Sequence, residues 1–149
     1  MSHRDRIAGF TLVELMVTVA IIAILASLAA PSFSDFIRNQ RIKNASFDLV
    51  SDLTYARSEA VKRNGSVTIS AAGGGWNEGW SITIEDGTSI RVHSPIGEGI
   101  SSTGDGTVEF NWAGRTVSPT QITLTAGSSS RCISVSLSGM PSASVGACS

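Results

Sequence analysis

A run of 20 consecutive residues without a charge, Leu15 to Ser34, constrains this chain more than any other feature of its sequence. At about 1.5 Å of rise per residue, a helix of that length matches a bilayer core of roughly 30 Å. With the residues that precede it, the run predicts a membrane-spanning helix over residues 10–34. Arg4 and Arg6 lie before this helix and, by the positive-inside rule, predict a cytoplasmic N-terminus and export of everything that follows.

One carboxylate, that of Glu14, lies inside the predicted membrane segment. A charge at that depth costs on the order of several kcal/mol and is normally retained only where a partner or a task offsets the cost. An ordinary secretory signal instead places an uncharged apolar region before a cleavage site of small residues. Glu14 therefore argues against a conventional signal peptide and for a segment that stays in the protein.

The helical pattern continues beyond Pro31, over residues 35–64. Pro31 removes one backbone donor, so it predicts a bend rather than an end of the helix. Apolar residues then recur at steps of three or four and form one stripe: Ile42, Ala45, Leu49, Leu53, Ala56 and Ala60. Charged residues are predicted on the other faces: Arg38, Arg41, Lys43, Asp48, Asp52, Arg57 and Lys62. Asn64-Gly65 suits a left-handed cap and predicts the helix end.

After Gly65 the composition shifts to Gly, Ser and Thr, and the apolar period becomes two. The predicted strands are Val67 to Ala71, Trp80 to Glu85, Ile90 to His93, Thr107 to Trp112, Ile122 to Thr125 and Cys132 to Leu137. Asp86-Gly87 predicts a hairpin turn. The stretches 73–75, 97–106, 127–130 and 138–147 are interpreted as loops. The fold class is therefore α+β, with a long N-terminal helix packed on a small antiparallel β-sheet head over residues 65–149.

Length and charge limit the functions open to the chain. Its 149 residues allow one core plus an appendage, and the net charge of -1 indicates no polyelectrolyte partner. His3 and His93 are far apart and form no ligand spacing with the cysteines, so no metal site is expected. The serines lack a placed general base, and no phosphate loop or cofactor fingerprint is present. We expect no catalytic residue, no cofactor and no enzymatic activity.

Aromatic residues and cysteines give two further expectations. Trp76, Trp80 and Trp112 are predicted to pack in the core, and His93 to be an exposed strand residue. Cys132 and Cys148 are the two cysteines of the chain. They would close a short C-terminal loop if the head reaches an oxidising compartment, and would otherwise be two free thiols.

The segment Gly9-Phe10-Thr11-Leu12-Val13-Glu14, followed by the apolar helix, resembles the class III signal of type IV prepilins. The resemblance implies that residues 1–9 are a leader, that a prepilin peptidase cleaves between Gly9 and Phe10, and that the new Phe10 amine is N-methylated. Removing nine of the 149 residues leaves a mature chain of 140. In an assembled filament, the family pattern pairs the Glu14 carboxylate with the Phe10 ammonium of a neighbouring subunit, a contact that sets register.

Further motifs resemble the GspH/FimT group of minor pilins and pseudopilins. They are Asp48-Leu49, Leu53, Tyr55-Ala56-Arg57-Ser58-Glu59-Ala60, Lys62-Arg63-Asn64 and Phe110-Asn111-Trp112-Ala113-Gly114-Arg115. The implied function is that of a minor pilin in the tip complex that initiates a type IV pilus, and hence a role in twitching motility or adhesion. The implied location is the bacterial inner membrane, as a single-pass protein with a periplasmic head, and then the pilus. The implied partners are prepilin peptidase, the inner membrane and other minor and major pilins.

Two alternatives remain open at this level. A GspH-type pseudopilin of a type II secretion system would carry the same leader and a similar head; the cysteine pair favours the pilus, because pilins of this kind often close their C-terminal region with a disulfide. Some relatives in the group are linked to DNA uptake through a C-terminal Gly-Arg-x-Arg. Here the corresponding residues are Gly139-Met140-Pro141-Ser142, and residues 64–149 carry three basic and six acidic side chains, so a nucleic-acid partner is not expected.

Overall fold

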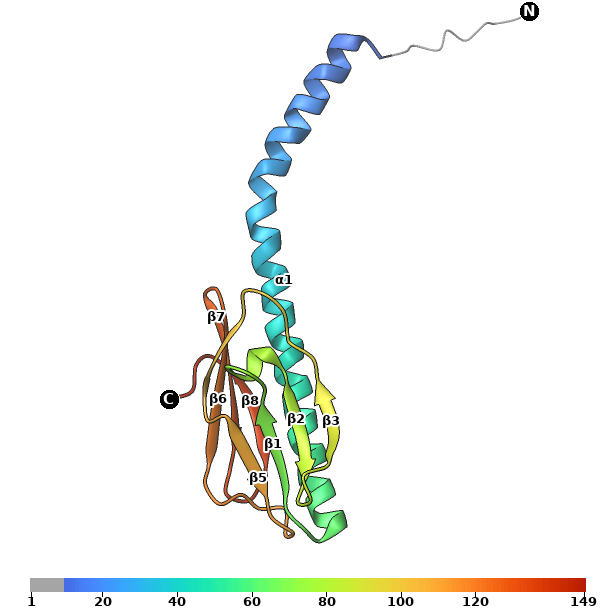
Figure 1. The fold of residues 1–149 in the computed structure, drawn as a ribbon. Helices are drawn as coiled ribbons and strands as arrows, with labels where there is room; N and C mark the ends of the chain where they lie inside the picture. Colours follow the sequence, from blue (N-terminus) through green and yellow to red (C-terminus); the bar gives the residue numbers. More distant parts are fainter. Residues whose placement is uncertain (1–9) are drawn as a thin grey trace, which may run out of the picture. The chain divides into compact units, whose positions relative to one another are not determined.

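A computed structural model describes residues 10–149, apart from the side chains of residues 28–32. One α-helix, a 3-10 turn and eight strands follow one another in this part of the chain (Figure 1). They are α1 (Leu12–Arg63), β1 (Val67–Ala71), η1 (Trp76–Glu78), β2 (Trp80–Ile84), β3 (Ser89–His93), β4 (Ser101–Gly104), β5 (Thr107–Phe110), β6 (Thr120–Ala126), β7 (Ser129–Val135) and β8 (Pro141–Val145). The chain divides into two compact units, Met1–Phe36 and Ile37–Ser149.

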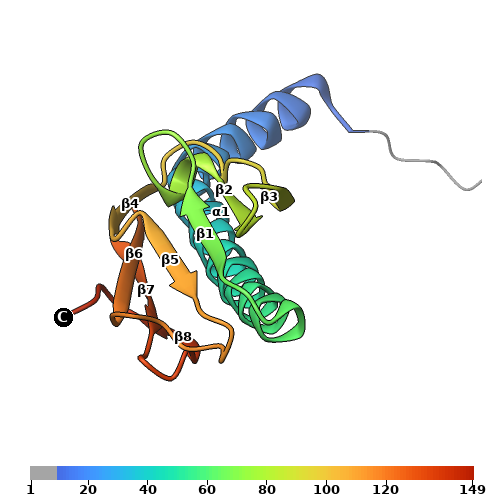
Figure 2. The same cartoon turned by 60° about the horizontal axis from the view of Figure 1, so that its bottom comes forward.

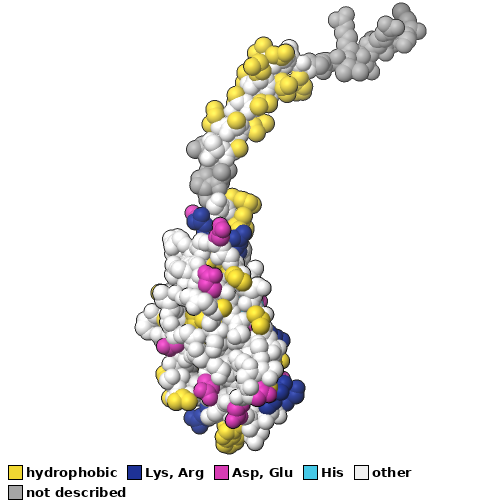
Figure 3. All heavy atoms as spheres, in the orientation of Figure 1, with side chains coloured by type: hydrophobic (Ala, Val, Ile, Leu, Met, Phe, Trp, Pro, Cys, Tyr) yellow, Lys and Arg dark blue, Asp and Glu magenta, His cyan; other side chains and the backbone are white. Residues whose placement is uncertain are grey.

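The described residues of the first unit are helical from Leu12 onward, and the helix continues through position 31 as predicted. The large apolar side chains that are described in this unit are exposed, and Figure 3 shows hydrophobic side chains along this part of the helix. Among residues 10–149, no helix is both long enough and apolar enough to cross a membrane. The predicted span over residues 10–34 is therefore not confirmed, and the bend at Pro31 stays a prediction.

In the second unit, α1 buries the apolar stripe that its sequence predicts. The buried residues on the helix are Ile42, Ala45, Leu49, Leu53, Ala56 and Ala60. The helix ends at Arg63, and Asn64 adopts the left-handed conformation with φ of 53°. The Gly65 N–H donates to the Ala60 carbonyl and the Asn64 N–H to that of Val61, which is the hydrogen-bond pattern of a Schellman cap. The predicted helix end is confirmed.

The strands form two four-stranded antiparallel sheets with the orders β3-β2-β1-β5 and β4-β6-β7-β8. In both ribbon views α1 runs alongside β1 and β2 (Figures 1 and 2). Alternate residues of each inner strand face the core; β6, for example, buries Thr120, Ile122, Leu124 and Ala126. The apolar ones among them join the helix stripe and the buried apolar residues of β1, β2 and β5, with Ile133 and Val135 of β7, in a single cluster. One core therefore connects α1 with both sheets.

Two strands lie in segments whose sequence predicts loops. They are β4, within 97–106, and β8, within 138–147; β7 also begins earlier than predicted, at Ser129. Neither β4 nor β8 buries a side chain, so neither has an apolar alternation to detect. Both lie at sheet edges, where pairing of the backbone with β6 and β7 holds them. The loop interpretation of these two segments is wrong.

Trp112 is also placed differently from its prediction. Strand β5 ends at Phe110, and Trp112 lies in the following turn with 63% of its surface exposed, whereas Trp76 and Trp80 are buried as predicted. The turn forms because the Asn111 side-chain oxygen accepts hydrogen bonds from the backbone N–H groups of Ala113 and Arg115, each at 3.0 Å. These bonds end the strand before Trp112 can pair.

Candidate functional site

The start of α1 is fixed by a reciprocal pair of hydrogen bonds between Thr11 and Glu14. The Glu14 backbone N–H donates to Thr11 Oγ1, and the Thr11 backbone N–H donates to Glu14 Oε2, both at 3.2 Å. This is a capping box, and its Thr-x-x-Glu signature is present in the sequence but was not used in the predictions above. Glu14 thus stabilises the helix start within its own chain.

The side chains next to this capping box are exposed. Phe10 and the large apolar residues of α1 up to Leu25 are exposed, whereas every buried core residue lies between Ile42 and Val135. The buried core found among the described side chains thus lies within the second unit. Phe10 directly precedes the capping box that Thr11 and Glu14 form, and Gly9 lies outside the described residues. Cleavage, N-methylation and the intersubunit pairing of Glu14 stay predictions.

Asp52, which was predicted on a face of the helix other than the apolar stripe, is buried. Its Oδ2 accepts a hydrogen bond from Trp80 Nε1 at 2.8 Å, and its Oδ1 pairs with Arg91 Nη1 at 2.6 Å. The Arg91 guanidinium also lies 3.9 Å from the centroid of the Tyr55 ring. The hydrogen bond to Asp52 is the main cause of a raised pKa of Arg91. These contacts join α1 to β2 and β3.

His93 completes the same polar cluster and is half-buried, not exposed as predicted. Its ring stacks on Trp80 with centroids 3.9 Å apart and planes 12° apart. Nε2 lies 3.7 Å from Asp48 Oδ2, and Nδ1 lies 2.8 Å from the Ser94 carbonyl oxygen. Both ring nitrogens thus face groups that position the ring. This geometry gives His93 a structural role at the end of β3.

A second polar group lies at the C-terminal end of α1. Glu59 is buried, although it was not part of the predicted stripe, and it accepts hydrogen bonds from Arg63 Nε at 2.7 Å and Lys62 Nζ at 3.4 Å. The bond from Arg63 is the main cause of a lowered pKa of Glu59. These pairs lie within one helix and stabilise its last turns.

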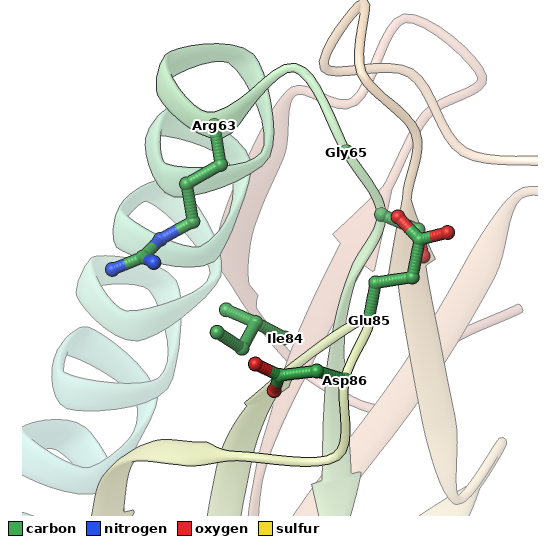
Figure 4. A pocket seen from close by; sticks show the side chains of 6 residues that line it. Arg63, Gly65, Ile84, Glu85 and Asp86 are labelled. Carbon is green, nitrogen blue, oxygen red and sulfur yellow. The ribbon is translucent and has the colours of Figure 1, made fainter.

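Beside this helix end is an open pocket of about 530 Å³. It is lined by Arg63, Gly65, Ser66, Ile84, Glu85 and Asp86. In Figure 4 the side chains of Ile84 and Asp86 point toward α1, and that of Glu85 points away. Hydrogen bonds from the Thr88 side chain and backbone lower the pKa of Asp86. These bonds lie within the predicted turn between β2 and β3, so Asp86 stabilises that turn. No group of three or more His, Cys, Asp or Glu suited to a metal ion occurs among the described residues.

The two cysteines form a disulfide, with Cα atoms of Cys132 and Cys148 4.9 Å apart. Cys132 lies on β7 and Cys148 follows β8, so the bond ties the C-terminal residues to the second sheet. The Cys148 N–H also donates to Thr123 Oγ1 at 3.1 Å. The predicted pairing is confirmed, and it encloses β8.

Comparison with known protein families identifies two matches along the chain. The family described as type II transport protein GspH matches residues 45–139, which is more than half of the chain. The prokaryotic N-terminal methylation motif matches residues 4–30. The first match covers the end of α1 and most of the head, and the second covers the region around the capping box.

Curated relatives and solved structures agree with these matches. Fimbrial protein Q of Moraxella bovis is 32% identical over 110 residues, covering 72% of this chain and 69% of that protein. A fimbrial protein of Pseudomonas aeruginosa is 40% identical over 63 residues, covering 42% of this chain and 40% of that protein. The crystal structure of the type IV minor pilin FimU of Pseudomonas aeruginosa is 22% identical, with a TM-score of 0.65, and covers 73% of this chain and 92% of that chain.

The helix with its capping box, the two antiparallel sheets and the C-terminal disulfide are thus found in a chain that matches both the methylation motif and the GspH family. The predicted fold, a long helix on an antiparallel β head, is confirmed by the likeness to FimU. The chain belongs to the GspH family and is a type IV pilin-like protein.

Proposed function

We propose that this protein is a minor pilin that takes part in the initiation and assembly of a type IV pilus, within the tip complex, and so supports twitching motility or adhesion. One observation carries the proposal: among the described side chains, the buried core residues all lie between Ile42 and Val135, whereas the large apolar ones between Phe10 and Phe36 are exposed. Apolar surface of this extent needs a partner outside the chain. A bilayer before assembly and the helices of other pilins afterwards would each supply one.

The start of α1 supports processing of the kind that such a protein needs. In this proposal prepilin peptidase cuts between Gly9 and Phe10, and the Phe10 amine is then methylated. The capping box engages Glu14 Oε2, while Oε1 makes no hydrogen bond within residues 10–149. That oxygen is available for the ammonium of a neighbouring subunit. The proposed location is the inner membrane, with the head on its periplasmic side, and then the pilus.

The second candidate function is that of a pseudopilin in a type II secretion system. The description of the matching family, type II transport protein GspH, favours it directly. The similarity to fimbrial protein Q of Moraxella bovis and the fold shared with FimU favour the pilus. The same leader and the same helix would serve both assemblies.

Deletion of the gene followed by complementation separates the two functions. Surface pili recovered by shearing and exoproteins in the medium are quantified from the same cultures. Loss of pili with intact secretion supports the minor pilin, and loss of secretion with intact pili supports the pseudopilin. Mass spectrometry of the complementing protein tests processing, which predicts an N-terminal methylated Phe10.

A further inference from the structure

Arg57, on α1, connects the helix to two loops of the head. Its Nε donates to the Gly114 carbonyl oxygen at 2.9 Å, and its Nη1 donates to Met140 Sδ at 3.4 Å. Gly114 belongs to the loop 111–119 between β5 and β6, and Met140 belongs to the loop 136–140 between β7 and β8. Both loops lie at the lower end of the head in Figure 1, where α1 ends. One guanidinium thus holds three segments together.

The backbones of the two loops are also in direct contact. Gly139 has φ of 74°, and a side chain at this position would collide with the Gly114 carbonyl oxygen. The Thr116 hydroxyl donates to the Ser136 carbonyl oxygen at 3.0 Å. The backbone that carries the Met140 side chain is therefore fixed beside α1.

The contact between Arg57 and Met140 joins a strong donor to a weak acceptor. A guanidinium is always charged and has five N–H donors, whereas the sulfur of a thioether accepts hydrogen bonds only weakly. Arg57 forms no ion pair within the described part of the chain, and residues 110–149, which include both loops, contain no Asp or Glu. The Nη1 group of Arg57 therefore faces an acceptor that does not match its charge.

The Met140 side chain is accessible to dissolved oxidants, because 56% of its surface is exposed. In a protein core, oxidation of methionine to the sulfoxide is disruptive, since it converts an apolar side chain into a polar one. Much of that cost is absent at Met140, whose side chain already faces water. A sulfoxide oxygen carries a partial negative charge and accepts hydrogen bonds better than a thioether sulfur. Oxidation at this position would thus supply the acceptor that Arg57 lacks.

We propose that Met140 is a site of oxidation by hydrogen peroxide and that Arg57 binds the resulting sulfoxide. The modification strengthens the attachment of the loop 136–140 to α1 instead of loosening it. This proposal does not depend on whether the chain enters a pilus or a secretion system.

The oxidation of Met140 transfers one oxygen atom from the peroxide to the sulfur. A lone pair of Sδ attacks one peroxide oxygen, so that an S–O bond forms and the O–O bond breaks. The departing hydroxide takes the proton of the new S–OH group and becomes water. The sulfur loses two electrons, which the peroxide gains. Rotation about the flexible side-chain bonds then brings the oxygen to Nη1 of Arg57, where it accepts a charge-assisted hydrogen bond.

Peroxide treatment of the purified full-length protein tests the proposal. Peptide mapping by mass spectrometry locates the sulfoxide and separates Met140 from the other two methionines of the chain. Hydrogen exchange of the peptide that contains Gly139 and Met140 then reports on the loop, because the N–H groups of both residues donate to Ser136. We expect a sulfoxide at Met140 and exchange that is about threefold or more slower than in the untreated protein.

Three variants separate this effect from a general effect of peroxide. Met140→Leu has no sulfur at this position, so peroxide should leave the exchange of the same peptide unchanged. Met140→Gln carries a permanent carbonyl acceptor and should show the slower exchange without peroxide. Arg57→Ala removes the donor, so oxidation should no longer slow the exchange. Disulfide content and circular dichroism report whether each variant is folded.

Three results would overturn the proposal. The first is that Met140 stays unoxidised at a peroxide concentration that oxidises the same peptide after digestion. The second is exchange that is unchanged or faster in the sulfoxide, and the third is an equal slowing in folded Arg57→Ala. If Arg57→Ala does not fold, the untreated Met140→Gln and Met140→Leu proteins decide, because equal exchange in the two would exclude binding of an oxygen acceptor by Arg57.

Discussion

Replacing Asp52 with alanine removes a carboxylate that two side chains of the first sheet share. Trp80 donates to one of its oxygens at 2.8 Å and Arg91 to the other at 2.6 Å. A hydrogen bond to a charged group contributes about 1.5–3 kcal/mol, and a buried donor left without a partner costs about 1–3 kcal/mol. The Arg91 side chain is 43% exposed, so its ion pair adds only about 0.5–1 kcal/mol. We expect Asp52→Ala to lower the free energy of unfolding by about 2–4 kcal/mol.

Asp52→Asn is the matched control, because its amide oxygen can still accept the Trp80 hydrogen bond. We expect it to cost about 1 kcal/mol, mainly from the loss of the charge opposite Arg91. Urea unfolding of residues 37–149, which contain every buried core residue, measures both variants by circular dichroism. A loss below about 1 kcal/mol for Asp52→Ala, or equal losses for the two variants, would refute the assignment of the Trp80 bond as the main contribution.

Two further predictions concern the disulfide and the helix end. Replacing both Cys132 and Cys148 with serine should lower the free energy of unfolding by about 3 kcal/mol, because the disulfide, with a sequence separation of 16, reduces the entropy of the unfolded chain. Urea unfolding measures the loss, and a value under about 1 kcal/mol would contradict the prediction. Because Arg63 holds the pKa of Glu59 below its ordinary value of 4.5, ionised Glu59 stabilises the fold above that value, and the contribution is lost as the pH falls through the lowered pKa. Glu59→Gln should therefore weaken the acid dependence of unfolding below about pH 4.5; equal pH slopes in the two proteins would exclude this role.

Features with a strong apolar period could be predicted from the sequence. The stripe from Ile42 to Ala60 recurs at helical spacing, and each of its members is buried. Strand β1 has a period of two instead, with Val67 and Ile69 buried, and its bounds are the predicted ones, Val67–Ala71. The helix end at Asn64-Gly65 was predictable because asparagine and glycine are the residue types that most often adopt the left-handed conformation at a helix end.

Features that depend on a tertiary partner could not be predicted. Strand β8 carries no apolar alternation, and its pairing with β7 is visible only in the fold. Asp52 resembles any charged residue of an amphipathic helix until Trp80 and Arg91 are brought beside it. The core position expected for Trp112 was wrong because the hydrogen bonds of Asn111 outweigh the strand preference of a tryptophan. The capping box, in contrast, depends on no tertiary partner, so Thr11 and Glu14 could have predicted it from the sequence.

The backbone contact between Gly114 and Gly139 separates two properties of the head that usually change together. The loop 111–119 between β5 and β6 and the loop 136–140 between β7 and β8 are positioned by this contact and by the hydrogen bond from Arg57 to the Gly114 carbonyl oxygen. Neither interaction involves the exposed side chains of Trp112, Val117 or Leu137. Substitutions at such exposed positions are usually within about 0.5 kcal/mol of neutral for stability. Related chains can therefore differ in the side chains that this end of the head exposes while they keep the same backbone.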